Sequence, residues 1–257
     1  MRPSLLEHTP VVILAGGLGT RLKSVVSDRP KALAPIGARS FLEIQLEILR
    51  DQGARRFVLC VGHRADQVQT EFGDGAHLGI HIDYSIEKEL LGTGGALRLA
   101  ERFFQPRALV LNGDTYLDAD YDRLLRHHQT QFGALATLTL ARLEDARRFG
   151  TVLVDSKEQN VIGFREKIET GPTQGWLNAG AYVIERDLLN RIPVDRPVSL
   201  EREVFPAAIA EGLRIAALPC EQPFYDIGTP EDFRRFNAWY GERCHERHST
   251  HSGRLAG

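Results

Sequence analysis

The stretch Val11-Val12-Ile13-Leu14-Ala15-Gly16-Gly17-Leu18-Gly19-Thr20-Arg21-Leu22, followed by Arg29-Pro30-Lys31, decides the fold of this chain. Its first five residues are apolar and predict a short buried strand. The glycines lack a Cβ atom, so the backbone can turn sharply and approach a ligand closely. Successive main-chain N–H groups in such a turn can bind an anion. Arg21 adds a planar guanidinium that pairs with phosphate oxygens, and Lys31 adds a mobile positive charge. Together these features predict a triphosphate-binding site.

Two familiar phosphate-binding loops do not fit these residues. A P-loop needs a glycine, then four residues, then Gly-Lys-Ser/Thr, and no such run follows Gly16 or Gly17. The dinucleotide fingerprint needs a third glycine where this chain has Leu22. It also needs an acidic residue at the end of the next strand, but the strand predicted over 57–61 is followed by Gly62-His63. These differences argue against a hydride-transferring enzyme.

The composition is that of an ordinary globular protein. The 257 residues, 42% hydrophobic and 26% charged, suit one large α/β domain or one domain with a small appendage. The net charge is −2 and the basic residues are scattered, so we expect no nucleic-acid partner. No apolar run approaches the ~20 residues that cross a bilayer, and the N-terminus lacks the features of a signal peptide. Cys60, Cys220 and Cys244 show no paired spacing, which fits a reducing compartment. We therefore expect a cytoplasmic protein with no membrane partner.

Short strands alternate with amphipathic helices through the first half of the chain. This order predicts a Rossmann-like α/β fold, with a mixed, mostly parallel sheet flanked by helices. The second half has shorter strands that suggest an antiparallel extension. There we expect a helix over 201–211, bent or split by Pro206, and a last helix from Pro230 to about Tyr240. We predict one domain over residues 1–240 and a flexible tail over 241–257, where no periodicity is visible.

Ligands of such sheets bind beyond the carboxyl ends of the strands. The loop Gly16–Gly19, the segment Glu87–Gly95 and Asp114 all follow predicted strands. We therefore expect three segments that are distant in sequence to meet at one crevice.

Two aspartates are candidates for a metal site. Asp114 follows a buried strand and a glycine, and Asp226 ends the apolar run Phe224-Tyr225 before a glycine turn. Two carboxylates at neighbouring strand ends suit Mg²⁺ that also binds substrate phosphates and water. Each aspartate could instead cap a turn. The nearby triphosphate loop favours the magnesium interpretation.

Glu87 is a candidate for base recognition. It precedes Leu91-Gly92-Thr93-Gly94-Gly95, where the glycines allow a purine ring to lie against the backbone. A carboxylate here could accept from the N1–H and the 2-amino group of guanine, although the N3–H of uracil or thymine would also satisfy it. The alternative is an acidic residue that interacts with the dipole of the following helix.

A second polar group suits a phosphorylated sugar. Glu166-Lys167 closes the strand predicted over 161–167, and Asn178 lies in the next one. Lys167 could bind the phosphate of a second substrate, while Glu166 and Asn178 could hydrogen-bond sugar hydroxyls. Glu166 and Lys167 could equally be solvated charges on an edge strand. Asn178 is harder to explain structurally, because asparagine is disfavoured in strands.

With these residues in view, the chain resembles the sugar-1-phosphate nucleotidyltransferases from about Val11 to Tyr240. The resemblance rests on the loop Gly16–Leu22 with Pro30-Lys31, and on Asn112-Gly113-Asp114, Phe164-Arg165-Glu166-Lys167, Asn178-Ala179-Gly180 and Asp226-Ile227-Gly228-Thr229. It implies the nucleotide-diphospho-sugar transferase fold. Within this family, Tyr84–Glu87, Leu91–Ala96 and Asn112–Thr115 look most like the D-glycero-D-manno-heptose 1-phosphate guanylyltransferases of bacterial surface-polysaccharide synthesis. Mannose-1-phosphate guanylyltransferases and muramate-1-phosphate uridylyltransferases share parts of the pattern.

The resemblance implies that a sugar-1-phosphate oxygen attacks the α-phosphorus of a nucleoside triphosphate, such as GTP, and expels pyrophosphate. It implies catalytic roles for Arg21 at the β- and γ-phosphates, Lys31 at the α-phosphate, Lys167 at the incoming phosphate, and Asp114, which with Asp226 would hold Mg²⁺. The implied nucleotide site comprises Leu14, Ala15, Gly16, Gly17, Gly19, Thr20, Arg21, Glu87, Gly92, Thr93 and Gly94. The implied sugar site comprises Asn112, Gly150, Glu166, Lys167 and Asn178.

Two alternatives stay open at this point. One is a different base or sugar, as in a mannose-1-phosphate guanylyltransferase or another uridylyl- or thymidylyltransferase. The other is a non-catalytic regulatory paralogue that binds a nucleotide-sugar, although such a protein would be expected to lose charged catalytic positions. Apolar residues near Trp239 and Tyr240, taken to be exposed, suit a homodimer contact.

Overall fold

The computed structural model describes residues 4–22, 24–143, 150–155, 159–165, 175–194 and 196–252. Its main feature is a nine-stranded sheet of order β5-β4-β1-β6-β11-β8-β12-β10-β9, with β11 also pairing with β9. The strands of this sheet are β1 (Val11–Leu14), β4 (Arg56–Val61), β5 (His81–Ile86), β6 (Arg107–Asn112), β8 (Ala134–Leu143), β9 (Thr151–Asp155), β10 (Asn160–Arg165), β11 (Gly175–Glu185) and β12 (Arg214–Cys220). Two small two-stranded sheets lie outside it: β2 (Pro35–Ile36) pairs with β3 (Arg39–Ser40), and β7 (Thr115–Leu117) pairs with β13 (Phe224–Asp226).

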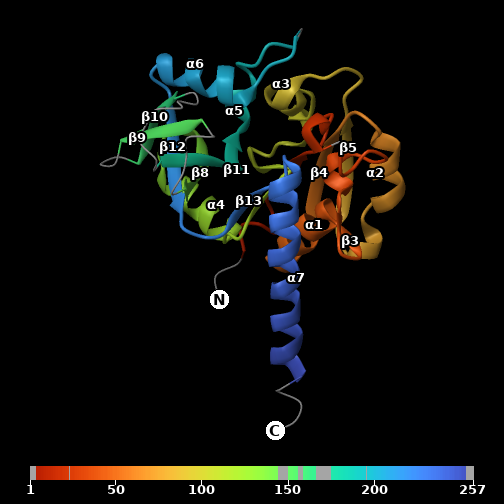
Figure 1. The fold of residues 1–257 in the computed structure, drawn as a ribbon. Coiled ribbons are helices and arrows are strands. Elements are labelled where there is room, and N and C mark those ends of the chain that lie inside the picture. The colour runs from red at the N-terminus through yellow and green to blue at the C-terminus, as the bar shows by residue number, and fades with distance from the viewer. Residues whose placement is uncertain are drawn as a thin grey trace.

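Helices connect and cover these strands (Figure 1). The α-helices are α1 (Phe41–Asp51), α2 (Ala65–Phe72), α3 (Gly92–Leu99), α4 (Tyr121–Thr130), α5 (Arg186–Leu189), α6 (Phe205–Ala210) and α7 (Pro230–Ser252). Short 3-10 turns are η1 (Thr20–Leu22), η2 (Lys31–Leu33), η3 (Ala76–Leu78) and η4 (Glu101–Phe103), and η5 (Leu200–Val204) is a π-helical turn.

The sheet is mixed, as the sequence predicts. β5, β4, β1 and β6 are all parallel, because each connection between them carries a helix that returns the chain. β11 is antiparallel to both β6 and β8, and β10 is antiparallel to β12 and β9, so the second half forms the expected antiparallel extension. Within that half only β12 and β8 run parallel among the described strands.

Alternation along the strands gives each face its own apolar core. Val11 and Ile13 of β1 face one core, which also takes residues of α1, α2 and α4. Val12 faces the other, which takes residues of α3, α5 and α6. The helices therefore lie on both faces of the sheet and leave the carboxyl edge of its parallel strands to the loops.

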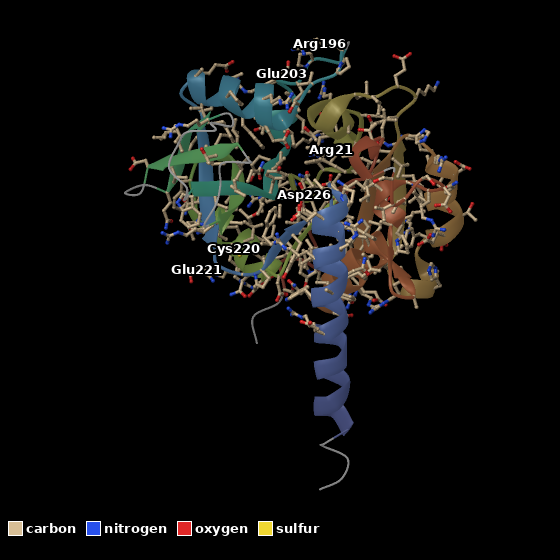
Figure 2. The ribbon with its side chains drawn as sticks, in the orientation of Figure 1. Arg21, Arg196, Glu203, Cys220, Glu221 and Asp226 are labelled. Atoms are coloured by element: carbon tan, nitrogen blue, oxygen red, sulfur yellow. The ribbon has the colours of Figure 1, made fainter. Side chains whose placement is uncertain are left out.

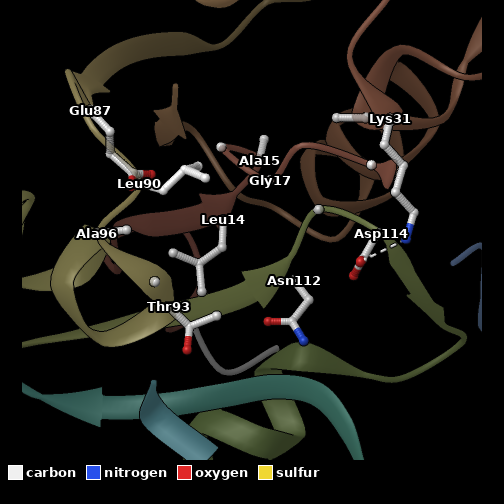
Figure 3. A pocket seen from close by; sticks show the side chains of 15 residues that line it. Leu14, Ala15, Gly17, Lys31, Glu87, Leu90, Thr93, Ala96, Asn112 and Asp114 are labelled. Atoms are coloured by element: carbon white, nitrogen blue, oxygen red, sulfur yellow. Dashed lines mark hydrogen bonds and ion pairs between the residues drawn. The ribbon is translucent and has the colours of Figure 1, made fainter. Parts of the chain in front are cut away.

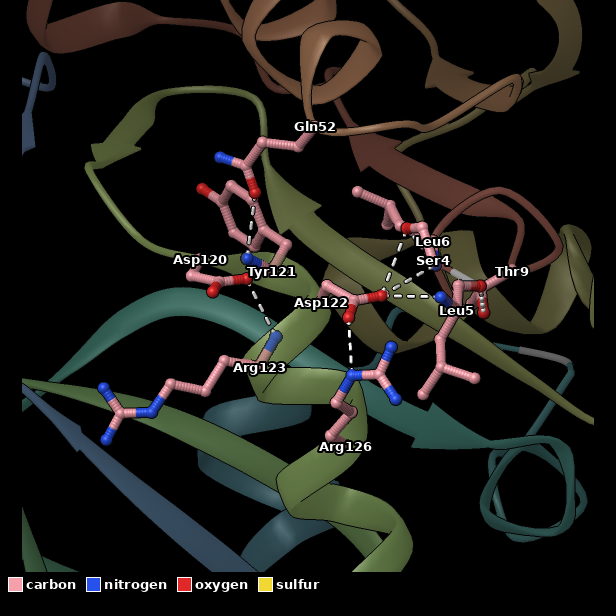
Figure 4. Close-up of polar contacts among 10 residues, drawn as sticks. All are labelled: Ser4, Leu5, Leu6, Thr9, Gln52, Asp120, Tyr121, Asp122, Arg123 and Arg126. Atoms are coloured by element: carbon pink, nitrogen blue, oxygen red, sulfur yellow. Dashed lines mark hydrogen bonds and ion pairs between the residues drawn. The ribbon is translucent and has the colours of Figure 1, made fainter. Parts of the chain in front are cut away.

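Polar contacts at their first turns hold two of these helices in place. Ser40 and Glu43 form a capping box at the start of α1, in which each side chain accepts from the backbone N–H of the other. At α4, Asp122 accepts hydrogen bonds from Ser4 Oγ (3.1 Å) and Leu5 N (2.6 Å), and from Arg126 Nε (2.7 Å) (Figure 4). This carboxylate fixes the start of the described chain against the far end of the sheet.

The predicted helix over 201–211 is split, as Pro206 suggests. The π-helical turn ends at Val204, and α6 begins at Phe205 with the proline in its first turn, where a missing N–H costs no helical bond. None of the described helices combines the length and the apolar character that crossing a membrane requires.

An aromatic cluster joins α7 to the two-stranded sheet of β7 and β13. Phe236 lies at its centre with no exposed surface, and its ring lies within 5.2 to 6.0 Å of Phe41, Tyr116, Tyr225 and Trp239. Because β13 pairs with β7 in the register Asp226 to Thr115, the cluster also fixes Asp226 beside the chain that follows β6.

α7 corrects two expectations. It continues to Ser252 and projects away from the body of the molecule (Figure 1), where the sequence predicts an end near Tyr240 and a tail after it. The residues after Tyr240 are mostly polar, so they show no apolar periodicity from which a helix could be predicted. Trp239 and Tyr240 are half-buried in the aromatic cluster, so the expectation that they are exposed is wrong, and the homodimer stays a prediction without that support.

Replacing Phe236 with alanine tests the role of this cluster. The substitution opens a cavity in a fully buried aromatic core, so we expect the free energy of unfolding to fall by about 3–5 kcal/mol. Urea unfolding of the full chain measures it. Phe132→Ala, at a side chain that is 87% exposed, is the matched control and should change stability by less than about 0.5 kcal/mol. Equal effects of the two substitutions would contradict the packing described.

Candidate active site

A cavity of about 250 Å³ lies at the carboxyl ends of β1 and β6 (Figure 3). The glycine loop, the residue after β5, the start of α3 and the end of β6 surround it, as the prediction of a shared crevice requires. Its lining residues are Leu14, Ala15, Gly16, Gly17, Gly19, Lys31, Ala32, Glu87, Leu90, Gly92, Thr93, Ala96, Asn112, Gly113 and Asp114.

Two glycines are needed where loops cross at this edge. Gly113 N donates to Leu14 O (2.9 Å), and a Cβ on Gly113 would lie 2.8 Å from that same oxygen. Gly19 has a φ of +59°, and its Cβ would lie 2.9 Å from Lys31 Cβ. The glycine loop is therefore packed directly against both the β6 turn and the lysine segment.

Lys31 lies between the two predicted metal ligands. It begins η2, and its Nζ lies 2.8 Å from Asp114 Oδ2 and 3.9 Å from Asp226 Oδ1. Asp114 precedes β7 while Asp226 ends β13, so the antiparallel hairpin, and not two neighbouring strand ends of the main sheet, brings them together. Ile227 N donates to Asp114 O (2.9 Å) and reinforces the pairing.

The electrostatics of Asp226 show how close these charges are. Burial and then the charge of Asp114 raise the pKa of Asp226, while Lys31, the N–H of Gly228 and Arg21 act in the opposite direction. Gly228 N donates to Asp226 Oδ1 at 2.6 Å. Two carboxylates thus share one ammonium group in a partly desolvated site.

Arg21 joins the same group of charges from η1. A Cβ on Gly228 would lie 3.3 Å from Arg21 Nη2, and Figure 2 shows Arg21 and Asp226 in the same central region. Arg21 and Thr20 are exposed and do not line the cavity of Figure 3. The guanidinium is therefore free to meet phosphate oxygens beside that cavity.

The carboxylate pair has the chemistry of a magnesium site that the ligand completes. Among the described residues there is no cluster of three or more histidine, cysteine, aspartate or glutamate side chains that could hold a metal. Mg²⁺ is commonly bound through one or two carboxylates with substrate phosphates and water in the other positions. Asp114 and Asp226 fit that pattern, and the ammonium of Lys31 already occupies the space between them as a cation.

Glu87 lies against the glycine loop. Its side chain is largely buried, Oε2 accepts from Leu91 N (2.9 Å), and a Cβ on Gly16 would lie 2.4 Å from Oε1. Burial raises the pKa of Glu87, partly opposed by the hydrogen bond from Leu91. Through Oε2, Glu87 thus contacts the backbone at the start of α3, as the alternative of an acidic residue beside that helix expects. Within the described part of the chain, Oε1 has no hydrogen-bond partner, and the carboxylate points toward the cavity (Figure 3).

The glycines at the start of α3 are required by the packing of the chain itself, whether or not a ligand binds there. Gly92 has a φ of +71°, and its Cβ would lie 2.5 Å from Val198 O. Gly94 N and Gly95 N both donate to that oxygen (2.8 and 3.3 Å). Gly94 is buried under Val198 and does not line the cavity, whereas Gly92 and Thr93 do.

The predicted sugar-site residues are only partly brought together. Glu166 and Lys167 lie outside the described residues. Gly150 is exposed before β9, beside Arg165 O, and does not line the cavity. Asn112 lines the cavity, whereas Asn178 does not and donates from Nδ2 to the hydroxyl of Tyr182 (2.8 Å).

Sequence reasoning misses Tyr182 and Glu201. Tyr182 donates to Glu201 Oε1 (3.2 Å), while Thr93 Oγ1 donates to Glu201 Oε2 (2.9 Å). The only local signal is a tyrosine hydroxyl in an otherwise apolar strand, which needs a partner when buried. Its separation from Glu201 follows no spacing that a sequence pattern can reveal.

The sequence and the fold of this chain are similar to those of known nucleotidyl transferases. Residues 10–243 match the nucleotidyl transferase family. The chain belongs to that family. The structure of HddC from Yersinia pseudotuberculosis matches with a TM-score of 0.79 and 31% identity, covering 90% of this chain and 99% of HddC. A complex of HddC with GMP-PN matches with a TM-score of 0.78. The predicted fold is thereby confirmed.

Two curated relatives are similar over most of this chain. A D-glycero-alpha-D-manno-heptose 1-phosphate guanylyltransferase from Campylobacter jejuni is 40% identical over 225 residues, which cover 88% of this chain and 97% of the relative. A mannose-1-phosphate guanylyltransferase from Mycobacterium tuberculosis is 41% identical over 234 residues, which cover 90% of this chain but 64% of the relative. This chain therefore spans less than two thirds of the mycobacterial protein.

Lys31→Met tests the charge balance of the site. The raised pKa of Asp226 means that its ionisation costs stability above that pKa, a cost that disappears as the pH falls through it. Lys31 offsets that cost. We expect Lys31→Met to lose about 1–3 kcal/mol of unfolding free energy near neutral pH, and the difference from the unsubstituted chain to shrink as the pH falls from neutral to mildly acidic values, where Asp226 takes up a proton.

Urea unfolding across that pH range measures the effect, with Lys88→Met as the control at an exposed lysine. A loss that is the same at every pH would show that Lys31 acts by packing and not by charge.

Proposed function

We propose that this protein is a sugar-1-phosphate guanylyltransferase, which joins GTP and a sugar 1-phosphate to give a GDP-sugar and pyrophosphate. The observation that carries the proposal is the cavity of the glycine loop, with Lys31, Asp114 and Asp226 at one side and Glu87 at the other. Membership of the nucleotidyl transferase family, and the two guanylyltransferases that are 40% and 41% identical, support it.

We propose D-glycero-D-manno-heptose 1-phosphate as the sugar substrate. The Campylobacter jejuni relative supports this choice because the match covers nearly its whole length. Mannose 1-phosphate is the second candidate, supported by the mycobacterial relative of slightly higher identity. We further propose a cytoplasmic role in supplying activated sugars for bacterial surface polysaccharides, on the sequence resemblance described above.

The reaction needs positioning and charge neutralisation more than proton transfer. The phosphate of the sugar is already anionic, so its oxygen can attack the α-phosphorus without a general base. A new P–O bond then forms as the bond to the pyrophosphate oxygen breaks, and pyrophosphate leaves. Side chains that position the two substrates, and fixed positive charges beside the phosphates, lower the activation barrier of such a reaction. In this proposal Lys31 faces the α-phosphate, Arg21 the β- and γ-phosphates, and Lys167 the incoming phosphate.

Asp114 and Asp226 would hold Mg²⁺ in this proposal. When bound, the ion would neutralise charge on the triphosphate. Binding it requires both carboxylates to be ionised and Lys31 to give up its place between them, where its Nζ lies 2.8 Å from Asp114. Lys31 would then turn from the carboxylates to the phosphates that enter with the metal.

Glu87 would read the base. Each carboxylate oxygen has two lone pairs, so Oε2 can keep the N–H of Leu91 while the carboxylate accepts the N1–H and 2-amino donors of guanine. Uracil or thymine offers one such donor. The paired donors of guanine use this carboxylate more fully.

A non-catalytic paralogue remains the rival from another class. Arg21, Lys31, Asp114 and Asp226 are all present and, among the described residues, lie around one site. A pyrophosphate-release assay with each common nucleoside triphosphate and with heptose, mannose or glucose 1-phosphate separates the two. No release with any pair would favour the paralogue.

Asp114→Asn tests the proposed metal site. The amide keeps the shape of the side chain but removes one of the two negative charges, so we expect pyrophosphate release with GTP to fall at least about 100-fold. The circular dichroism spectrum should stay that of the unsubstituted protein. Asp66→Asn, at an exposed position in the first turn of α2, is the control and should leave the rate unchanged. A rate for Asp114→Asn near that of the control would refute the assignment.

Glu87→Gln tests base choice. A glutamine can accept only one of the two guanine donors, and its own N–H₂ opposes the other, so we expect the KM for GTP to rise about tenfold or more. The N3–H and carbonyl of uracil match a glutamine better, so kcat/KM for UTP should rise relative to that for GTP. An unchanged ratio of the two would exclude Glu87 from base recognition.

The same variant tests the pH dependence. Because the pKa of Glu87 is raised, the unsubstituted protein should lose affinity for GTP as the pH falls toward mildly acidic values, where the carboxylate takes up a proton. Glu87→Gln should lack that loss. Calorimetric titration with GTP at a series of pH values measures both.

A further inference from the structure

Arg64 occupies a backbone position that an arginine rarely takes. It follows β4 at the start of α2 and has a φ of +58°, in the left-handed region that favours glycine and asparagine. It is also the N-cap of α2, where serine, threonine, aspartate and asparagine are preferred, and its side chain makes no capping hydrogen bond. Strained residues persist where the surrounding structure requires them, and they gather at functional sites. The contacts of its side chain must therefore explain why an arginine stands here.

That side chain contacts the exposed segment that precedes Lys31. Arg64 Nη1 donates to Ser27 O (3.1 Å). Three residues further along, Gln67 Nε2 donates to the next carbonyl, Asp28 O (3.2 Å). Two side chains from the start of α2 thus hold two consecutive carbonyl groups of one exposed segment.

The second contact leaves a polar atom of Gln67 unpaired. Its Oε1 is buried and has no hydrogen-bond partner among the described residues. Buried acceptors are nearly always paired, and an apolar side chain here would leave no acceptor to satisfy. The two side chains therefore hold the segment despite two unfavourable features, an unpaired buried oxygen and a left-handed arginine.

The held segment joins the two cations of the proposed triphosphate site. On one side, Leu22 directly follows Arg21, and its carbonyl oxygen accepts from Val26 N (2.9 Å). On the other side, Pro30, whose ring restricts its φ, is the N-cap of the turn that begins at Lys31. Few freely rotating bonds separate the held carbonyl groups from either cation, so the position of the segment sets the positions of both.

The start of α2 is itself fixed beside the glycine loop. β4 and β1 are parallel neighbours, with Cys60 opposite Leu14. After these strands the two turns stay close, because a Cβ on Gly62 would lie 3.2 Å from Gly16 O. A turn built on the central sheet is a firmer support than an exposed segment, and functional side chains need such support to keep their positions.

We propose that Arg64 and Gln67 are positioning residues, which hold the segment 24–30 so that the two cations that flank it face a bound triphosphate. This inference rests on the proposed function for the identity of the ligand. Neither side chain lines the cavity. Both therefore act on the nucleotide through Arg21 and Lys31, and not by contact.

Hydrogen exchange of the full chain without ligand tests the contacts themselves. Gln67→Met keeps the length of the side chain but removes the donor. Arg64→Asn supplies a residue that tolerates the left-handed conformation but is too short to reach Ser27. We expect the amides over 24–33 to exchange at least about threefold faster in both variants. Gln69→Met, at an exposed position of the same helix, is the matched control and should exchange like the unsubstituted protein.

Calorimetric titration with GTP and with guanosine tests the consequence. Guanosine carries the base without phosphates, so it does not use the two cations. In Gln67→Met and Arg64→Asn we expect the affinity for GTP with Mg²⁺ to fall about five- to tenfold, and that for guanosine to stay within about twofold. A merely structural defect would weaken the binding of both ligands. Because Gln67→Met changes no charge, its effect separates positioning from the field of Arg64.

Arg64→Lys is the conservative variant. It keeps the positive charge and a donor of similar reach, so it should recover most of the affinity for GTP that Arg64→Asn loses. Unchanged exchange in Gln67→Met and Arg64→Asn, or equal losses of GTP and guanosine affinity, would overturn the proposal. Failure of the unsubstituted protein to bind GTP or to release pyrophosphate would instead refute the proposed function, and the exchange measurement would still decide whether the two side chains hold the segment.

Discussion

The mutual repulsion of Asp114 and Asp226 is the constraint on which the rest of this site depends. Two carboxylates that bind one cation must lie close together, and burial makes their closeness costly before the cation arrives. The chain holds them by three means: the antiparallel pairing of β7 with β13, the ammonium of Lys31 and the N–H of Gly228. This strand pair packs in turn against the aromatic cluster around Phe236. A helix at the end of the chain thus stabilises charges at the centre of the molecule.

The part of the site on the main sheet could be predicted from the sequence. The glycine loop, Glu87 and Asp114 each follow a parallel strand, and the carboxyl ends of parallel strands meet at one edge of the sheet. Strand periodicity and glycine position therefore place them together. Asp226 is different, because its strand pairs outside the main sheet with β7. That long-range pairing leaves no mark in the local sequence, so only its apolar run and glycine turn pointed to it.

Two other features could not be predicted for different reasons. The far end of α7 is polar, and a polar helix shows no apolar stripe from which its length can be read. Tyr182 and Glu201 meet because the π-helical turn lies over β11, and such a contact depends on how the layers stack, not on spacing along the chain. Sequence patterns report burial and turns well, but they report the partners of buried polar groups poorly.

Several residues have a structural role that is compatible with the functional role proposed for them. Glu87 uses one oxygen to hold the backbone before α3 and leaves the other toward the cavity. Gly92 gives Val198 room to approach and also forms part of the cavity wall. Because the backbone of this wall is already fixed by its own hydrogen bonds, a ligand would meet groups whose positions are set before binding. The entropy of ordering them is then part of folding and not of binding, which favours tight and selective recognition by a small cavity.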